Sequence, residues 1–378
     1  MKAIILLLAM AVMALATTPN LVVYGTSYGV NAVPELAEGE YYVGVWGGSR
    51  ARHVIALTSE GELLAWGDNS EGQCDIPGDL PSFPVVPISA AASLTRSYVA
   101  FSDGSVRWWG EGSSGSYGPG HPLWVTQVAV DMDYHSIFLR EDGTIYPGPG
   151  VTVPAPNQDW TYIAAGSDHY LGVKENGSVI CWGSNSYGQL DVPDSGPFVA
   201  VAGGWYHSLG LKEDGSIAAW GYNFYGQCTI PAPNTGFVSI AAGENHSVAL
   251  KASGLVKAWG SNSYGQCGIN GMVGVEAIAA GASYSVALLP PPTGIDSVSF
   301  EGIPQLSLSA FPNPSNGYLE FSLTNGGEVD VYDVSGRIVS LVSIPQSGSV
   351  SWTAPTTGVY FASVRGSDTP ATRFVIVR

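Results

Sequence analysis

Charge and cysteine are both scarce in this sequence, and each shortage excludes a class of protein. Charged residues make up 12% of the 378 residues and hydrophobic residues 45%, a balance typical of a folded chain rather than a disordered one. The few charges are unequal in sign, since 31 acidic against 14 basic residues give a formal net charge of −17. Because a phosphate backbone repels such a chain, we expect no nucleic-acid partner.

Long apolar runs are missing after the N-terminus. Residues 1–16 read MKAIILLLAMAVMALA, in which Lys2 precedes an apolar run that ends at Ala14-Leu15-Ala16. This order is typical of a cleavable secretory signal peptide. A short membrane anchor is the alternative, but the run is shorter than the roughly 20 residues that a spanning helix needs. We therefore expect cleavage after Ala16 and an exported chain with no transmembrane span.

The four cysteines do not form the pattern of a disulfide framework. Cys74, Cys228 and Cys267 each follow a Gly-Gln pair, whereas Cys181 precedes Trp182. Cysteines at one position of a repeat belong to successive structural units and do not face one another. The paired spacings of a zinc site are also absent. We expect free, mostly buried thiols and no metal or other cofactor.

A Trp-Gly pair recurs through the first three quarters of the chain. Clear copies lie at Trp66, Trp109, Trp182, Trp220 and Trp259, and a degenerate copy lies at Pro147. A period of roughly 40 residues indicates a propeller or a solenoid. Each copy contains short apolar or alternating runs separated by Asp-Gly or Glu-Gly turns, and none has the period of a helix. Each copy is therefore predicted to be a four-stranded antiparallel meander. In the copy around Trp220, the last strand is predicted in residues 228–231.

The two ends of the repeat region complement each other. Residues 277–289 match the first half of a copy, and residues 21–34 match the second half. Pairing these halves would close a ring and remove its exposed strand edges. The fold class is therefore predicted to be all-β, with a seven-bladed β-propeller over residues 17–289 that is closed by its N- and C-terminal strands.

The repeated words carry a family resemblance. The pattern GxxHSxALxxDGxxxxWGxNxYGQ resembles the regulator-of-chromosome-condensation repeat, which the type II β-lactamase inhibitor protein shares. The resemblance covers residues 21–290 and is weakest over 90–150. It implies a seven-bladed propeller, in agreement with the count above. Guanine-nucleotide exchange, the activity of one branch, is not expected, because the signal peptide argues against a cytosolic GTPase partner.

The constant residues of the repeat are interpreted as scaffold. The tryptophans are expected to wedge between blades. His53, His135, His169, His207 and His246 occupy one repeat position, with Tyr98 and Tyr284 assigned to it in other copies. A ring of imidazoles suggests metal binding or pH sensing. A position that is filled in nearly every copy and accepts tyrosine instead favours a repeated hydrogen bond within the scaffold.

Catalytic and metal-binding patterns are missing. Asp68, Glu71 and Asp75 lack the glycine and the distal glutamate of an EF-hand. No nucleophile elbow, phosphate loop or metalloprotease helix is present. The chain is therefore not predicted to be an enzyme.

The variable residues gather on one predicted face. In a meander, the loop before His and the loop after Trp-Gly lie at the same end of the ring, and these loops change from copy to copy. A fixed scaffold with variable loops is typical of a binding surface. Aromatic residues are favoured anchors there for a protein or glycan partner. The candidate binding residues are Trp205, Tyr206, Tyr222 and Phe224, flanked by Asp168 and Glu244.

The C-terminal quarter has a different composition. Residues 290–305 begin with three prolines and are predicted to be a linker, and residues 306–378 alternate as a small β-sandwich would. This segment resembles the type A sorting domain of the type IX secretion system. The resemblance rests on Phe311, Pro312, Asn313, Pro314, Gly336, Arg337, Gly358 and Tyr360 and on the terminal residues 373–378. It implies export by that machinery, with an adhesive β-sandwich as the alternative.

Taken together, these features predict a secreted or bacterial cell-surface propeller that binds a protein or glycan partner through variable loops on one face. The alternative is an enzyme inhibitor or a carbohydrate-active enzyme on the same scaffold.

Overall fold

The computed structural model describes residues 20–290, except 82–84, 113, 118–123, 134 and 194–195, together with seven strands of the C-terminal segment. The predicted signal peptide and residues 291–305 of the predicted linker lie outside the described residues. Within the described part, the elements are β-strands and one short 3₁₀ helix, η1 (Ser27–Gly29).

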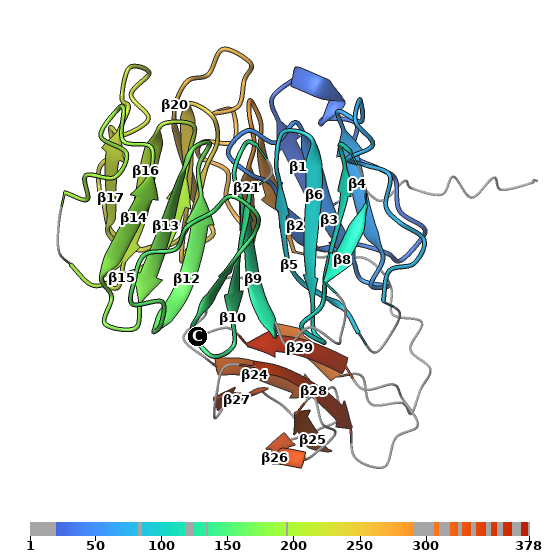
Figure 1. Cartoon of the computed structure of the whole chain (residues 1–378). Helices are drawn as coiled ribbons and strands as arrows, with labels where there is room; N and C mark the ends of the chain where they lie inside the picture. The colour runs from blue at the N-terminus through green and yellow to red at the C-terminus, as the bar shows by residue number, and fades with distance from the viewer. Residues whose placement is uncertain are drawn as a thin grey trace, which may run out of the picture.

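Residues 20–290 form seven antiparallel sheets, which are the blades of a propeller (Figure 1). The blades are blade 1, β2 (Tyr42–Trp46), β3 (His53–Thr58) and β4 (Leu63–Gly67); blade 2, β5 (Pro87–Ala92), β6 (Arg96–Phe101), β7 (Val106–Gly110) and β8 (Gly115–Tyr117); blade 3, β9 (Val125–Val130), β10 (Ser136–Arg140) and β11 (Ile145–Pro147); blade 4, β12 (Trp160–Ala165), β13 (His169–Lys174) and β14 (Val179–Gly183); blade 5, β15 (Phe198–Gly203), β16 (His207–Lys212) and β17 (Ile217–Gly221); blade 6, β18 (Phe237–Ala242), β19 (His246–Lys251) and β20 (Val256–Gly260); and blade 7, β21 (Ala277–Ala280), β22 (Ser285–Leu288) and β1 (Leu21–Tyr24). The first strand of each blade contacts the first strand of the next, and β21 contacts β2. The predicted seven-bladed ring is therefore confirmed.

The ring closes through the N-terminal strand. β1 pairs with β22 in antiparallel register, from Leu21 opposite Leu288 to Tyr24 opposite Ser285. The buried Asn20 side chain adds hydrogen bonds to this closure. Its Nδ2 donates to the carbonyls of Tyr42 and Leu289, at 2.8 and 2.9 Å, and its Oδ1 accepts the Tyr42 N–H at 2.8 Å. The predicted pairing of the two half-copies is confirmed.

The expected fourth strand is wrong for six of the seven described blades, since only blade 2 has one, in β8. The segment after each Trp-Gly pair folds on itself instead. In blade 5 the Asn223 Oδ1 accepts the Cys228 N–H at 2.8 Å, and the Gln227 Oε1 accepts the Tyr225 N–H at 3.0 Å. Side chains of the loop take the hydrogen bonds that a neighbouring strand would have supplied, so the segment forms turns.

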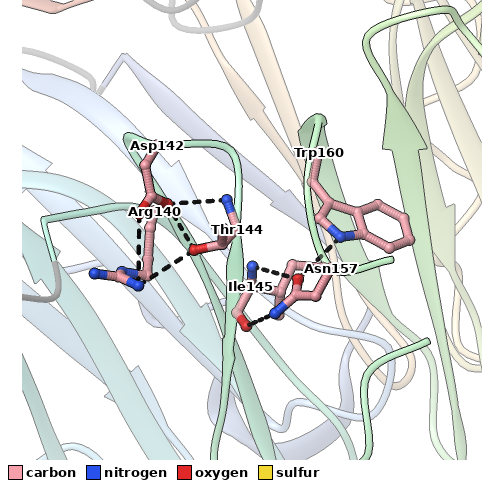
Figure 2. Close-up of polar contacts among 6 residues, drawn as sticks. All are labelled: Arg140, Asp142, Thr144, Ile145, Asn157 and Trp160. Atoms are coloured by element: carbon pink, nitrogen blue, oxygen red, sulfur yellow. Dashed lines mark hydrogen bonds and ion pairs between the residues drawn. The ribbon is translucent and has the colours of Figure 1, made fainter. Parts of the chain in front are cut away.

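An asparagine also covers the outer strand of blade 3, β11, at Ile145 (Figure 2). Asn157 Oδ1 accepts the Ile145 N–H at 2.9 Å, and its Nδ2 donates to the Ile145 carbonyl at 2.8 Å. Asn234 makes the same pair of bonds with Ile217 in blade 5. A side-chain amide thus replaces one residue of a fourth strand and protects an exposed edge.

The constant residues fasten neighbouring blades together. Between blades 5 and 6, the Gln227 carbonyl accepts hydrogen bonds from Ser247 Oγ and Trp259 Nε1, both at 2.8 Å, and His207 Nε2 lies 3.1 Å from the same Ser247 Oγ. We call this His–Gln–Ser–Trp group the clasp. It recurs with Trp at the seam of blades 1 and 2 and of blades 4 and 5, and without Trp at the seam of blades 6 and 7. The predicted scaffold role of the histidines and the wedge role of the tryptophans are confirmed there.

The clasp fixes the protonation of its histidines. Because the serine hydroxyl donates its hydrogen to the glutamine carbonyl, the imidazole Nε2–H must be the donor to Ser Oγ. These imidazoles are fully buried, and burial lowers the pKa of His53, His169 and His246 to about 4 and that of His207 to about 3. The ring is therefore held by neutral histidines.

Three members of the histidine position differ from the others. Arg96, and not Tyr98, occupies it in blade 2, because Arg96 pairs with Gly110 as His207 pairs with Gly221. Tyr284 occupies it in blade 7, and its hydroxyl donates to the His53 carbonyl across the closing seam. The His135 side chain is 41% exposed, and its Nδ1 lies 3.1 Å from Oδ2 of Asp131 in its own blade.

The cysteines are free, as predicted, but they are only partly buried. Cys228 Sγ donates to the carbonyls of Trp220 and Tyr222, each at 3.4 Å. Burial raises the pKa of Cys181 and Cys228 to about 12, which keeps these thiols protonated and unreactive at neutral pH.

The C-terminal segment forms two antiparallel sheets that contact each other through β26 and β27. Their strands are β23 (Leu306–Ser309), β24 (Tyr318–Leu323), β25 (Gly327–Asp333), β26 (Ile338–Ile344), β27 (Ser349–Thr353), β28 (Gly358–Val364) and β29 (Thr372–Ile376). This agrees with the predicted small β-sandwich. Of the sorting-motif residues, Gly358 and Tyr360 lie in β28, whereas 311–314, 336 and 337 lie outside the described residues.

Candidate binding face

Two loops from each blade meet at the end of the ring that carries η1, the upper end of the propeller in Figure 1. The loop before the histidine and the loop after Trp-Gly are joined by a backbone bond, such as Tyr222 N–H to the Tyr206 carbonyl at 2.8 Å. The close approach requires glycine after the tryptophan. A Cβ on Gly221, whose φ is +94°, would lie 2.6 Å from the Tyr206 carbonyl oxygen. The constant glycine thus holds the variable loops in place.

The loops before the histidines also interlock from blade to blade. Trp205 N–H donates to the Glu244 carbonyl at 3.1 Å, and Ser167 N–H donates to the Gly204 carbonyl at 3.2 Å. Residues of successive blades are therefore fixed relative to one another near the axis of the ring. A rigid backbone lets the variable side chains form a surface of defined shape.

Arg50 of blade 1 reaches across this surface. Its guanidinium lies 4.7 Å from the centre of the Trp205 ring of blade 5 and donates to Met132 Sδ of blade 3. Burial raises the pKa of Asp168 and of Glu244, and the positive charge of Arg50 opposes that shift at both carboxyls. The Arg50 side chain thus contacts blades 3 and 5 and partly compensates the acidic groups of Asp168 on blade 4 and Glu244 on blade 6.

Six aromatic rings form a continuous cluster over blades 4 and 5. Trp205 and Tyr206 stack with their ring centres 4.7 Å apart, and Tyr222 and Phe224 stack at 6.3 Å. Tyr187 of blade 4 joins the two pairs, since its ring lies 4.6 Å from Tyr206 and 5.1 Å from Tyr222. The full aromatic cluster comprises Tyr187, Trp205, Tyr206, Tyr222, Phe224 and Tyr225.

The aromatic cluster has a half-buried base and an exposed crest. Trp205, Tyr206 and Tyr222 are half-buried, whereas Phe224 is 77% exposed and Tyr225 is 48% exposed. A phenylalanine with that exposure stabilises the isolated propeller little, because water still covers most of its ring. The half-buried rings (the base) hold Phe224 and Tyr225 (the crest) in place, and the crest presents apolar area to solvent.

All six predicted binding residues lie on this face, and the structure brings them together. Asp168 interacts electrostatically with Tyr206, and Glu244 holds Trp205 through its backbone. Their role in binding remains a prediction. Sequence reasoning missed Tyr187 and Tyr225 because both stand in the constant Tyr-Gly-Gln words. Both tyrosines precede a turn glycine, where side chains point outward, and this position could have indicated that they are exposed.

The described part of the chain contains neither a metal-binding cluster nor a membrane-spanning helix. No group of three or more His, Cys, Asp or Glu residues there is arranged to hold a metal ion. The same residues include no helix with the length and hydrophobicity that a bilayer crossing requires.

Two family descriptions match this chain. Residues 51–73, 160–189, 198–227 and 237–266 match the regulator of chromosome condensation (RCC1) repeat. Residues 309–378 match the secretion system C-terminal sorting domain. The two predicted resemblances are confirmed, and the aromatic cluster lies within the matched segments 160–189 and 198–227.

Known relatives and structures resemble the propeller. A bovine (Bos taurus) protein called secretion-regulating guanine nucleotide exchange factor is 31% identical over 147 residues, which cover 36% of this chain and 28% of that protein. The yeast (Saccharomyces cerevisiae) Prp20p structure aligns with a TM-score of 0.60 and 20% identity over 71% of this chain and 90% of that one. Human WBSCR16 aligns with a TM-score of 0.58 and 18% identity over 72% of this chain and 100% of that one. These structures share the fold, and the chain spans less than a third of the bovine relative.

Proposed function

We propose, on the premise that this chain carries RCC1 repeats followed by a secretion-system sorting domain, that it is a secreted or bacterial cell-surface propeller whose variable-loop face binds a protein or glycan partner. The sorting domain accounts for export, and the repeats account for a rigid scaffold. The partner is bound by the aromatic cluster and the flanking Asp168 and Glu244.

The observation that carries this proposal is the exposed crest of the aromatic cluster. Phe224 and Tyr225 place apolar area in solvent on a face whose backbone is fixed by the clasps and by blade-to-blade hydrogen bonds. Exposed aromatic groups on a pre-organised surface are favoured contact residues, because they bury much area at little cost in conformational entropy. Their grouping on one blade supports a localised site.

Guanine-nucleotide exchange is the activity in the name of the bovine relative. We do not propose it for this chain, because a sorting domain directs the protein away from a cytosolic GTPase. An inhibitor or a carbohydrate-active enzyme on the same scaffold stays the alternative, and no residue of this chain is assigned to catalysis.

The test compares two exposed aromatic residues of neighbouring blades. Phe224→Ala removes the crest of the aromatic cluster, whereas Tyr264→Ala removes a ring that is 53% exposed on blade 6. Full-length protein with each substitution is used to capture surface proteins and glycans from the producing cells. We expect Phe224→Ala to weaken capture at least tenfold and Tyr264→Ala to leave it within about twofold. Equal capture by the wild-type protein and Phe224→Ala would overturn the proposal.

A further inference from the structure

The wedge tryptophan of blade 4, Trp182, lacks the hydrogen-bond acceptor that the other wedge tryptophans have. Its Nε1 is buried and has no partner among the described residues. The other wedges each donate Nε1–H to a main-chain carbonyl in the loop of the preceding blade. The donor and acceptor residues, at 2.8 to 2.9 Å, are Trp66 and Val30, Trp109 and Gln73, Trp220 and Gln189, and Trp259 and Gln227. A buried donor without an acceptor is costly, so this position favours a ligand that supplies one.

A shortened connection in blade 3 explains the missing acceptor. The connection from β11 to β12 spans residues 148–159, whereas the connection from β17 to β18 in blade 5 spans residues 222–236. Residues 148–159 also contain no Tyr-Gly-Gln word. The loop whose glutamine carbonyl accepts the indole N–H at a clasped seam is therefore absent from the described seam of blades 3 and 4.

The serine position of this seam is changed as well. Tyr170 occupies it, because Tyr170 lies opposite Trp182 in the strand register, as each clasp serine lies opposite the tryptophan of its clasp. The Tyr170 hydroxyl donates to Asp131 Oδ2 of blade 3 at 2.7 Å. The phenol thus ties the two blades together, and the indole N–H stays without a partner.

A cavity of about 420 Å³ opens beside the indole. One wall is formed by residues 150–152 and Pro154 of the shortened connection, and the other by Tyr170, Trp182 and Gly183 of blade 4. Its volume lies in the range of small-ligand sites, roughly 300–1,000 Å³. Because its wall contains the residues at the serine and tryptophan positions, the cavity lies where a Tyr-Gly-Gln loop packs at the clasped seams.

The walls of the cavity favour an uncharged ligand with a carbonyl group. None of the described residues that line it is charged. The rings of Tyr170 and Trp182 stack at 5.5 Å with 21° between their planes, which makes much of one wall apolar. A sugar would bury several hydroxyls with few partners there, whereas a peptide carbonyl needs only the one indole donor that is free.

We infer that the seam of blades 3 and 4 binds a peptide segment of a partner protein, in a tight turn whose main-chain carbonyl accepts the Trp182 Nε1–H. The chain's own loops show which peptide shape fits such a place. In blade 4 the Gln189 Oε1 accepts the Tyr187 N–H at 2.8 Å, and the Asn185 Oδ1 accepts the Leu190 N–H at 2.9 Å. None of the residues that line the cavity belongs to the aromatic cluster, so the two sites can be tested independently.

The test follows the indole N–H resonances of the full-length ¹⁵N-labelled protein by NMR during titration with a peptide of residues 185–192, NSYGQLDV. Trp182→Phe assigns one resonance by removing it, and Trp220→Phe assigns that of a clasped wedge. We expect the peptide to shift the Trp182 resonance and to leave the Trp220 resonance in place. A scrambled peptide of the same composition and charge is the control and should shift neither.

Affinity for the same peptide, carrying a fluorescent label, is measured by anisotropy. Trp182→Phe keeps an aromatic ring and loses the donor, so it should bind the peptide at least tenfold more weakly. Trp220→Phe makes the same change at a clasped seam and should bind within about twofold of the wild-type protein. Phe224→Ala should bind as the wild-type protein does, and a loss there would move the peptide to the aromatic cluster and overturn the inference.

Urea unfolding without peptide gives a second measurement. Trp220 Nε1 has an acceptor in the free protein and Trp182 Nε1 has none among the described residues, so Trp220→Phe should lower the unfolding midpoint more than Trp182→Phe does. Equal decreases would show that the Trp182 indole already has a partner, and the inference would fall.

Three titration results would also overturn the inference: no shift of the Trp182 resonance, the same shift with the scrambled peptide, or equal affinity of the wild-type protein and Trp182→Phe. Cellohexaose, a neutral oligosaccharide, is titrated in parallel. A Trp182 shift with cellohexaose and not with the peptide would assign the cavity to a sugar instead.

Discussion

At the residue scale, one repeat position performs a structural task that its chemistry first suggests is functional. A histidine in a ring of similar histidines resembles a metal ligand or a pH sensor. Here its Nε2 donates to a serine of the next blade, and its burial keeps it neutral. The loop that precedes the histidine carries the side chains that differ from blade to blade.

Neutral buried histidines make stability depend on pH. The pKa of His207 is about 3 in the folded protein and 6.5 as its ordinary value, so below pH 6.5 the unfolded chain binds a proton that the folded chain does not. Stability is therefore complete above pH 6.5 and falls as the pH falls toward 3. For His207 alone the loss between pH 7.5 and pH 5 is about 2 kcal/mol.

The measurement is urea unfolding of the wild-type protein and of His207→Gln at pH 7.5 and pH 5. The glutamine amide can still donate to Ser247 Oγ but does not titrate, so the variant should lose less stability on acidification. The comparison also cancels the opposite contribution of Asp131 and Glu244, whose pKa values burial raises. The same acid sensitivity in both proteins would contradict the assignment.

At the element scale, the four-residue strand β1 closes the whole ring. β1 completes blade 7 from the other end of the domain, and Asn20 seals it to blade 1. A strand that closes a ring removes two exposed edges at once. Its loss should therefore affect the whole propeller and not one blade.

Asn20→Ala tests this closure. The substitution leaves the Tyr42 N–H and carbonyl without their 2.8 Å partners in a buried place, which costs about 2–4 kcal/mol of the free energy of unfolding. Asn69→Ala is the matched control, because its bonds to Asp75 and Cys74 lie in an exposed loop and should contribute less than about 1 kcal/mol. Similar losses in both variants, measured by urea unfolding, would show that closure contributes nothing special.

The repeat predicted most elements, and the misses have physical reasons. The turns, the strand pairs and the closing of β1 on β22 follow from periodicity, which local sequence carries. The fourth strand was wrong because Asn223 and Asn157 replace backbone partners with side-chain amides, and a short apolar run does not reveal that. Arg96 was missed because blade 2 has no histidine to set the register.

At the scale of the whole molecule, the binding face could be predicted only in part. The grouping of Trp205, Tyr206, Tyr222 and Phe224 follows from meander geometry. The reach of Arg50 from blade 1 to Trp205 of blade 5 does not, because it depends on the closed ring and on loop conformations. The sorting domain then accounts for export, and we propose that the propeller supplies the surface that meets a partner.

The central claim is that the partner meets the variable-loop face, and not the opposite face, which carries the Asp-Gly and Glu-Gly hairpin turns. Its most direct test places a photo-crosslinking amino acid at Phe224, 77% exposed on the first face, or at Asp214, exposed at a hairpin on the second. Each full-length protein is irradiated with the producing cells. We predict specific adducts from position 224 and none from position 214. No adduct from position 224, or the same adducts from both positions, would contradict the account.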